Sequence, residues 1–104
     1  MSDTIKIAAN VLKTEANELT RNAEILDGEF EKAVEVLYKT KGKVVVTGVG
    51  KSGHVGAKIA ATLASTGTPS FFMHPTEAMH GDLGMIGKND TMLAISFSGE
   101  SEEL

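Results

Sequence analysis

A short β-branched run that ends at a glycine constrains the fold of this chain more than any other feature. Residues 43–47 read Lys-Val-Val-Val-Thr and Gly48 follows, which is typical of a buried strand. A helical pattern covers residues 51–65, and two further short apolar segments follow at 70–73 and 91–96. Strands that alternate with helical connections form a parallel sheet with helices on its faces. The sequence therefore predicts an α/β fold.

Residues 1–41 precede that sheet and are predicted to be helical. Small and aliphatic side chains recur at alternating spacings of four and three, which places them on one helix face. These residues are Ile5, Ala9, Leu12, Ala16, Leu19 and Ala23. Such a face packs either against the core of its own domain or across a subunit boundary, and the pattern leaves both open. Asp27 and Gly28 interrupt the pattern, and a second helix follows with Gly42 as its expected C-terminal stop.

Composition narrows the function classes. Ten basic against fourteen acidic residues give a net charge of -4, which argues against nonspecific nucleic-acid binding. The absence of cysteine excludes disulfides, a thiolate nucleophile and a cysteine-based zinc site, and it fits a cytoplasmic protein. No apolar run approaches the roughly 20 residues that cross a bilayer, and the N-terminus shows no secretory signal, so we expect no membrane partner.

The glycine-rich stretch at residues 48–53, Gly-Val-Gly-Lys-Ser-Gly, tempts a nucleotide interpretation that fails on required parts. A dinucleotide fingerprint needs an acidic residue at the end of the second strand, where this chain has Phe-Met-His-Pro at 72–75. A phosphate loop of the Walker type needs a glycine five residues before Gly50, and Val45 stands there. Both nucleotide classes are therefore disfavoured.

The same stretch still has the properties of an anion site. Glycines let the backbone approach a ligand closely, and the start of a helix offers unpaired N–H groups. Lys51 and Ser52 add a charge and a hydroxyl at that rim. The alternative is that the glycines serve only strand-to-helix packing and that Lys51 is a solvated surface lysine.

A second polar stretch, at residues 96–103, follows the third strand. Ser96, Ser98 and Ser101 surround Gly99, at the strand end where open parallel sheets bind ligands. Hydroxyls together with helix N–H groups suit a phosphate. The simpler alternative is that Ser98 or Ser101 caps the next helix, and capping and phosphate binding are compatible.

The loop at residues 74–84 carries more titratable groups than a plain connector needs. It contains His74, Glu77, His80 and Asp82, and histidine exchanges protons near neutral pH. A metal site made of His74, His80 and Asp82 is one alternative, although it lacks the helical i,i+4 spacing of many such sites. The other alternative is that these side chains hold the loop together by hydrogen bonds.

Taken together, four stretches resemble the arabinose-5-phosphate isomerase family, which is built on the sugar isomerase (SIS) fold. The stretches are residues 47–54, 65–72, 80–84 and 95–101, and the similarity runs without gaps from about residue 27 to the end. The resemblance implies a three-layer αβα architecture with a five-stranded parallel sheet. It divides the chain into an N-terminal helical segment, 1–41, and the first half of a SIS domain, 42–104, with about three of the five strands.

The resemblance also implies a function. Family members interconvert arabinose 5-phosphate and ribulose 5-phosphate through an enediol, in the synthesis of the acid sugar of lipopolysaccharide or capsule. They act in the cytoplasm as oligomers, usually tetramers, without a redox cofactor, and we expect no metal. By motif, Lys51, His80 and Glu103 fall on catalytic positions, and the substrate-binding positions are Gly50, Ser52, Ser96, Ser98 and Ser101. The rival is a SIS module that binds a sugar phosphate without turning it over.

Two departures from the family pattern qualify that expectation. Phe97 stands where relatives often have a small polar residue, which bears on substrate preference if the ring faces the ligand. The chain also stops before the family's further catalytic glutamate and histidine and before any CBS domains. We therefore expect these 104 residues alone to be inactive as an isomerase.

Overall fold

The computed structural model describes residues 2–99 and divides the chain into two compact units. The first is Met1–Val34 and the second is Glu35–Leu104. None of the helices in residues 2–99 is both long enough and apolar enough to span a bilayer.

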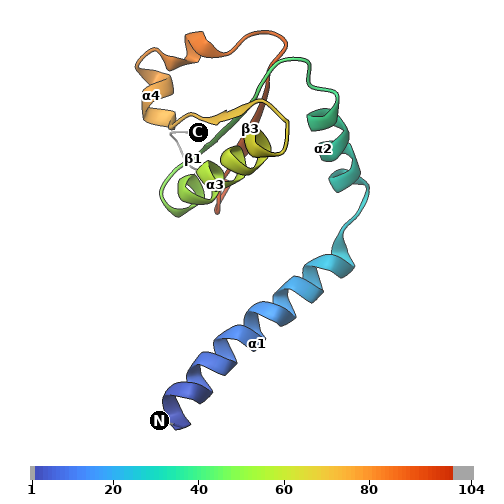
Figure 1. Ribbon diagram of the computed structural model, residues 1–104, viewed down its shortest axis with the longest axis vertical. Helices are drawn as coiled ribbons and strands as arrows, with labels where there is room; N and C mark the ends of the chain where they lie inside the picture. Colours follow the sequence, from blue (N-terminus) through green and yellow to red (C-terminus); the bar gives the residue numbers. More distant parts are fainter. Residues whose placement is uncertain (1, 100–104) are drawn as a thin grey trace. The chain divides into compact units, whose positions relative to one another are not determined.

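Two helices open the chain, as the sequence predicts (Figure 1). Helix α1 covers Ser2–Ile25 and helix α2 covers Gly28–Tyr38. The break between them is stabilised by Asp27, whose carboxylate accepts a hydrogen bond from the backbone N–H of Glu29 at 3.0 Å. Helix α1 contains no buried residue, and its apolar stripe is exposed, with Leu12 66% and Leu19 73% accessible.

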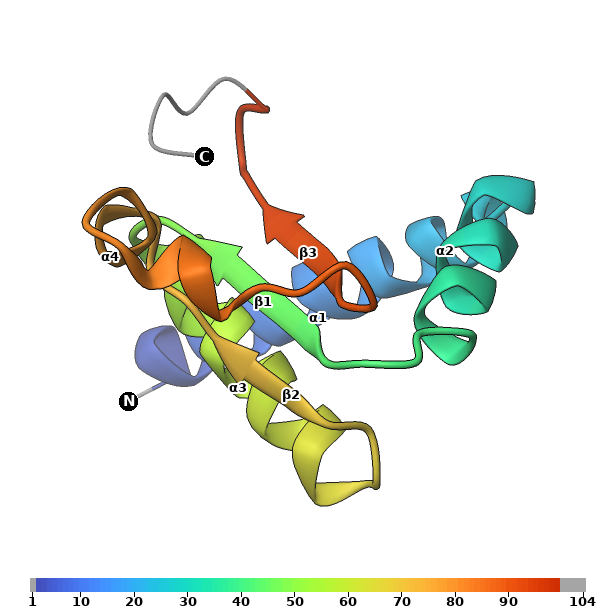
Figure 2. The same ribbon diagram turned by 90° about the horizontal axis from the view of Figure 1, so that it is seen from above.

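The second unit is built on a three-stranded parallel sheet (Figures 1 and 2). The strands are β1 (Val44–Gly48), β2 (Ser70–Phe72) and β3 (Thr91–Ile95), in the spatial order β2-β1-β3. Helix α3 (Lys51–Ser65) joins β1 to β2, and it matches the expected range of 51–65. The short helix α4 (Pro75–Met79) and a 3-10 turn, η1 (Asp82–Met85), lie between β2 and β3. The predicted α/β fold with a parallel sheet is therefore confirmed.

The core forms where α3 covers the central strand. Val44, Val45 and Val46 of the central strand β1 are fully buried. Ala60 of α3 joins Val44 and Val46 in one apolar cluster, against which side chains from α2, α3, β2 and β3 pack. These are Leu37, Ile59, Leu63, Phe72, Leu93 and Ile95. Burial on this scale fixes α3 against the sheet and so fixes where its first turn lies.

Two glycines of α3 allow that close approach. A Cβ atom at Gly53 would lie 2.7 Å from the carbonyl oxygen of Gly48, and one at Gly56 would lie 3.1 Å from the ring of Phe72. Side chains at these positions would push the helix away from the sheet. The packing role that the sequence left open for the glycine-rich stretch is therefore confirmed for Gly53.

Gly42 has a different role from the one expected. Helix α2 ends at Tyr38, so Gly42 is not its C-terminal stop. The backbone N–H of Gly42 instead donates to the carbonyl of Asn89 at 2.8 Å, and a Cβ atom there would collide with the Asp90 carboxylate. Gly42 is required by the close approach of two loops at the amino ends of the strands.

Candidate functional site

The strand order places the two polar loops of the sequence at one point. The chain leaves β1 for β2 on one side, and then crosses over to β3 on the other side of β1 (Figure 2). The direction of winding therefore reverses between β1 and β3, which makes their carboxyl ends the topological switch point of the sheet. Gly48 and Ile95, the last residues of β1 and β3, are register partners. The segments 49–53 and 96–99 therefore leave the sheet side by side.

Helix α3 begins in the first of these segments. Gly50 is its N-cap residue, with φ 61° and ψ -130°, and as a glycine it has no side chain with which to cap the helix. The first backbone bonds of the turn run from the N–H of Gly53 to Val49 and from that of His54 to Gly50. The N–H groups of Lys51 and Ser52 thus come before the helical ladder, where a helix is able to bind an anion. Lys51 is exposed and Ser52 is half-buried.

The second segment is a tight turn held by a serine. The Ser96 hydroxyl accepts a hydrogen bond from the backbone N–H of Gly99 at 2.8 Å, and Gly99 has φ 76°. Ser96 is half-buried, Ser98 is exposed, and the Phe97 side chain is fully exposed. Ser101 and Glu103 lie outside the described residues. Their site assignments stay predictions.

The loop after β2 is organised by its first histidine. His74 is the N-cap of α4, and its Nδ1 accepts a hydrogen bond from the backbone N–H of Thr76 at 3.0 Å. His80 is the C-cap of the same helix, and its backbone N–H donates to the carbonyls of Thr76 and Glu77. His80 is exposed.

Within residues 2–99, no three histidine or acidic side chains gather closely enough to hold a metal ion. His74, His80 and Asp82 therefore do not form a metal-binding group in this structure. The competing interpretation, in which the loop is held by hydrogen bonds, is confirmed for His74.

A pocket of about 250 Å³ adjoins the switch point. It is lined by Gly50, Gly53, His54, Ala57, Phe72 and His74, which come from the first turns of α3 and from the end of β2. The sequence did not single out His54 as a site residue. The position of His54, one turn after Gly50 on α3, could have indicated that it lies at the same site, because residues four apart lie on one helix face.

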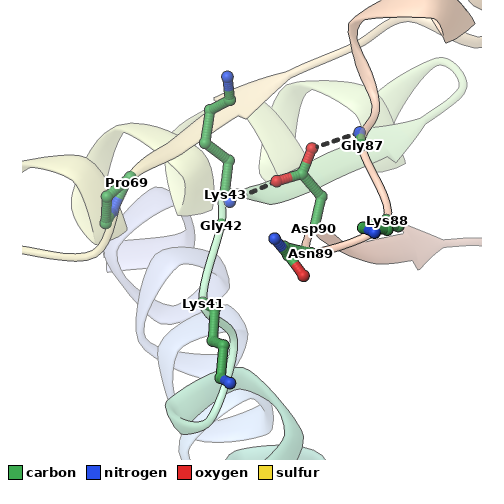
Figure 3. A pocket seen from close by; sticks show the side chains of 8 residues that line it. All are labelled: Lys41, Gly42, Lys43, Pro69, Gly87, Lys88, Asn89 and Asp90. Atoms are coloured by element: carbon green, nitrogen blue, oxygen red, sulfur yellow. Dashed lines mark hydrogen bonds between the residues drawn. The ribbon is translucent and has the colours of Figure 1, made fainter.

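A larger pocket, of about 580 Å³, lies at the opposite end of the strands (Figure 3). Asp90 organises this end, since its two carboxylate oxygens accept the backbone N–H groups of Lys43 and Gly87 at 2.7 Å each. These two hydrogen bonds, from Lys43 first and then Gly87, lower the pKa of Asp90 below its ordinary value. The side chains of Lys41 and Lys43 point in opposite directions in Figure 3, so they do not converge on one ligand.

The structure thus brings together five of the eight expected site residues at neighbouring strand ends. They are Gly50, Lys51, Ser52, Ser96 and Ser98. His80 lies further along the chain, after β2, at the end of α4.

The chain is similar in sequence to proteins named as arabinose 5-phosphate isomerases. The chain is 54% identical over its full length to arabinose 5-phosphate isomerase GutQ of Salmonella typhi, of which it covers 33%. It is 67% identical over 76 residues, 73% of this chain and 23% of the relative, to arabinose 5-phosphate isomerase KdsD of Pseudomonas aeruginosa. The chain spans about a third of the length of the curated relatives that it matches most fully.

A solved structure is also similar to this chain over most of its length. The c3406 protein of Escherichia coli CFT073, solved in complex with arabinose 5-phosphate, superposes with a TM-score of 0.78 at 50% identity. The match covers 94% of this chain and 54% of that one. The SIS domain family itself matches residues 36–104, which include β1, α3, β2, α4 and β3. This chain therefore belongs to the SIS domain family.

Proposed function

We propose that the full-length protein interconverts arabinose 5-phosphate and ribulose 5-phosphate. The observation that carries the proposal is the pairing of Gly48 with Ile95, because it sets the glycine-rich loop and the serine loop side by side at the switch point. The relatives named as arabinose 5-phosphate isomerases and the sugar-phosphate complex of the E. coli protein support this choice of substrate.

In this proposal the substrate phosphate is bound between the two loops. The N–H groups at the start of α3 and the hydroxyls of Ser52 and Ser98 donate to its oxygens. Ser96 shapes the second loop through its bond to Gly99 and contributes at the same rim. Ser101 completes the set from the chain beyond residue 99.

The chemistry is a proton transfer without net oxidation, so it needs no redox cofactor. A base removes the proton from C2 of the open-chain aldose, an enediol forms, and a proton is returned at C1. A second transfer moves a proton between the oxygens on C2 and C1. We assign Lys51 to stabilisation of the oxyanion, Glu103 to proton transfer, and His80 to ring opening or to binding of a sugar hydroxyl.

The wider setting also belongs to the proposal. Residues 42–104 form the first half of the SIS domain, and residues 1–41 form a helical segment ahead of it. The protein acts in the cytoplasm as a tetramer, in the supply of the acid sugar of lipopolysaccharide or capsule. The exposed apolar stripe of α1 supports association between subunits.

Proton NMR of the full-length protein with arabinose 5-phosphate tests the function directly. We expect the signals of ribulose 5-phosphate to grow until the two sugars reach equilibrium. A matched Lys51→Ala variant controls for a contaminating isomerase. If calorimetry detects binding of arabinose 5-phosphate but no ribulose 5-phosphate forms, the protein is a non-catalytic sugar-phosphate module and the proposal is wrong.

A further inference from the structure

His74 occupies a helix position that a histidine seldom takes. It is the N-cap of α4, where serine, threonine, aspartate and asparagine are preferred. Pro75 follows at the first helical position and has no N–H, so Thr76 carries the first N–H of the helix that needs an acceptor. The Nδ1 atom of His74 is that acceptor, at 3.0 Å.

This hydrogen bond requires one particular tautomer of the His74 imidazole ring. A nitrogen that accepts an N–H must carry a lone pair, so this hydrogen bond is made by the Nε2–H tautomer of the ring. The same residue lines the 250 Å³ pocket beside Gly50 and Gly53, at the start of α3. His74 thus contacts both the pocket and the first turn of α4.

The far end of α4 carries a proposed active-site residue. The helix is five residues long, and His80 is its C-cap. The carbonyl of His74 accepts from the N–H of Ala78 at 3.0 Å, and the carbonyl of Thr76 accepts from that of His80 at 3.2 Å. A helix of five residues has few backbone hydrogen bonds, so we expect loss of the cap to loosen the turn up to His80.

We infer that His74 is a positioning residue for His80, acting through the cap of α4 in its neutral Nε2–H form. The inference rests on the proposed function, in which His80 acts on the sugar. In the proposed function the loops after β1 and β3 bind the substrate phosphate, whereas His80 stands at the far end of α4 from His74. Disturbance of the cap should therefore lower kcat while KM for arabinose 5-phosphate stays nearly constant.

The test compares three variants of the full-length protein. His74→Ala removes the cap, and His74→Asn keeps an oxygen acceptor for the Thr76 N–H. Asp27→Ala is the matched control, because Asp27 also accepts a backbone N–H two residues further on at 3.0 Å, at the start of α2. We expect His74→Ala to lower kcat at least about fivefold, which is the factor that corresponds to the free energy of one lost helix cap. His74→Asn should restore most of the lost kcat. Asp27→Ala should leave kcat near that of the parent.

Two further measurements do not depend on activity. Hydrogen exchange at the amides of Ala78 and His80 should speed up in His74→Ala and stay slow in His74→Asn and Asp27→Ala. ¹⁵N NMR of labelled histidine should show an unprotonated Nδ1 and a protonated Nε2 for His74. If the parent does not turn over arabinose 5-phosphate, the proposed function fails and these two measurements alone decide whether His74 caps α4.

Several results would overturn the inference. Equal kcat in His74→Ala and the parent would show that the cap does not position His80. An equal loss in His74→Asn and His74→Ala would show that the ring, and not the cap, is required. An equal loss in Asp27→Ala would show that the effect is general destabilisation.

Discussion

Gly53→Ala alters the contact that sets the first turn of α3 against the sheet. The new methyl group would lie 2.7 Å from the carbonyl oxygen of Gly48, which is backbone in the central strand and is unable to move aside. Overpacking of this kind costs about 1–3 kcal/mol, while replacement of a helical glycine by alanine contributes about 1 kcal/mol in the other direction. Because the clash is with backbone, we expect a net loss of about 1–2 kcal/mol in the free energy of unfolding.

The control for this change is Gly28→Ala, at the start of α2. Apart from its own helix backbone and its chain neighbours, no described residue lies within 4 Å of a Cβ at Gly28, so alanine there should be neutral or slightly stabilising. Urea denaturation of the two full-length variants at equal protein concentration measures both effects. Opposite or unequal shifts of the midpoint are expected, and equal midpoints would show that Gly53 does not limit the packing of α3.

The same substitution should also impair the site. A shift of α3 away from β1 carries Lys51 and Ser52 with it, and a displacement of about 1 Å is able to cost about 100-fold in rate. We expect kcat/KM of Gly53→Ala for arabinose 5-phosphate to fall at least about tenfold, with Gly28→Ala unchanged. Full activity in a Gly53→Ala protein would refute the claim that the start of α3 forms part of the site.

Other substitutions test single groups. Lys51→Ala should leave the fold intact and lower turnover by about 100-fold or more, and a steady-state rate within about threefold of the parent would show a surface lysine. Replacement of both Ser98 and Ser101 by alanine should weaken the binding of phosphorylated ligands by about 2–4 kcal/mol in calorimetry, and unchanged affinity would contradict their role. Asp90→Ala should lower the urea midpoint at pH 7, because the folded-state pKa of Asp90 is depressed and its contribution is present above the ordinary value of 3.8. That difference from the parent should shrink as the pH falls below 3.8 and the carboxylate protonates, and a constant difference would exclude the charge as its cause.

The elements of the fold could be predicted because their signals are local. The β-branched run before Gly48 and the helical pattern after it predicted β1 and α3 to within a residue. The role of Gly42 could not be predicted, because its partners, Asn89 and Asp90, are distant in sequence. A pairing of this kind depends on tertiary structure, which periodicity does not report.

The candidate site could also be predicted only in part. The hydroxyls at the strand ends indicated a site in the loops after β1 and β3. That these two loops lie side by side depends on the strand order β2-β1-β3. The cap formed by His74 was invisible in sequence, since histidine is not a usual N-cap and the loop suggested a metal as readily as a hydrogen bond. His54 offered only a weak signal, because one histidine on a helix has many uses.

The most direct test of the central claim is a crystal structure of the full-length protein with arabinose 5-phosphate. The phosphate should lie at the carboxyl ends of β1 and β3, within hydrogen-bond distance of the backbone N–H groups of Lys51 and Ser52 and of the Ser98 hydroxyl. A sugar phosphate bound instead at the amino ends of the strands, beside Lys43 and Lys88, would contradict the account.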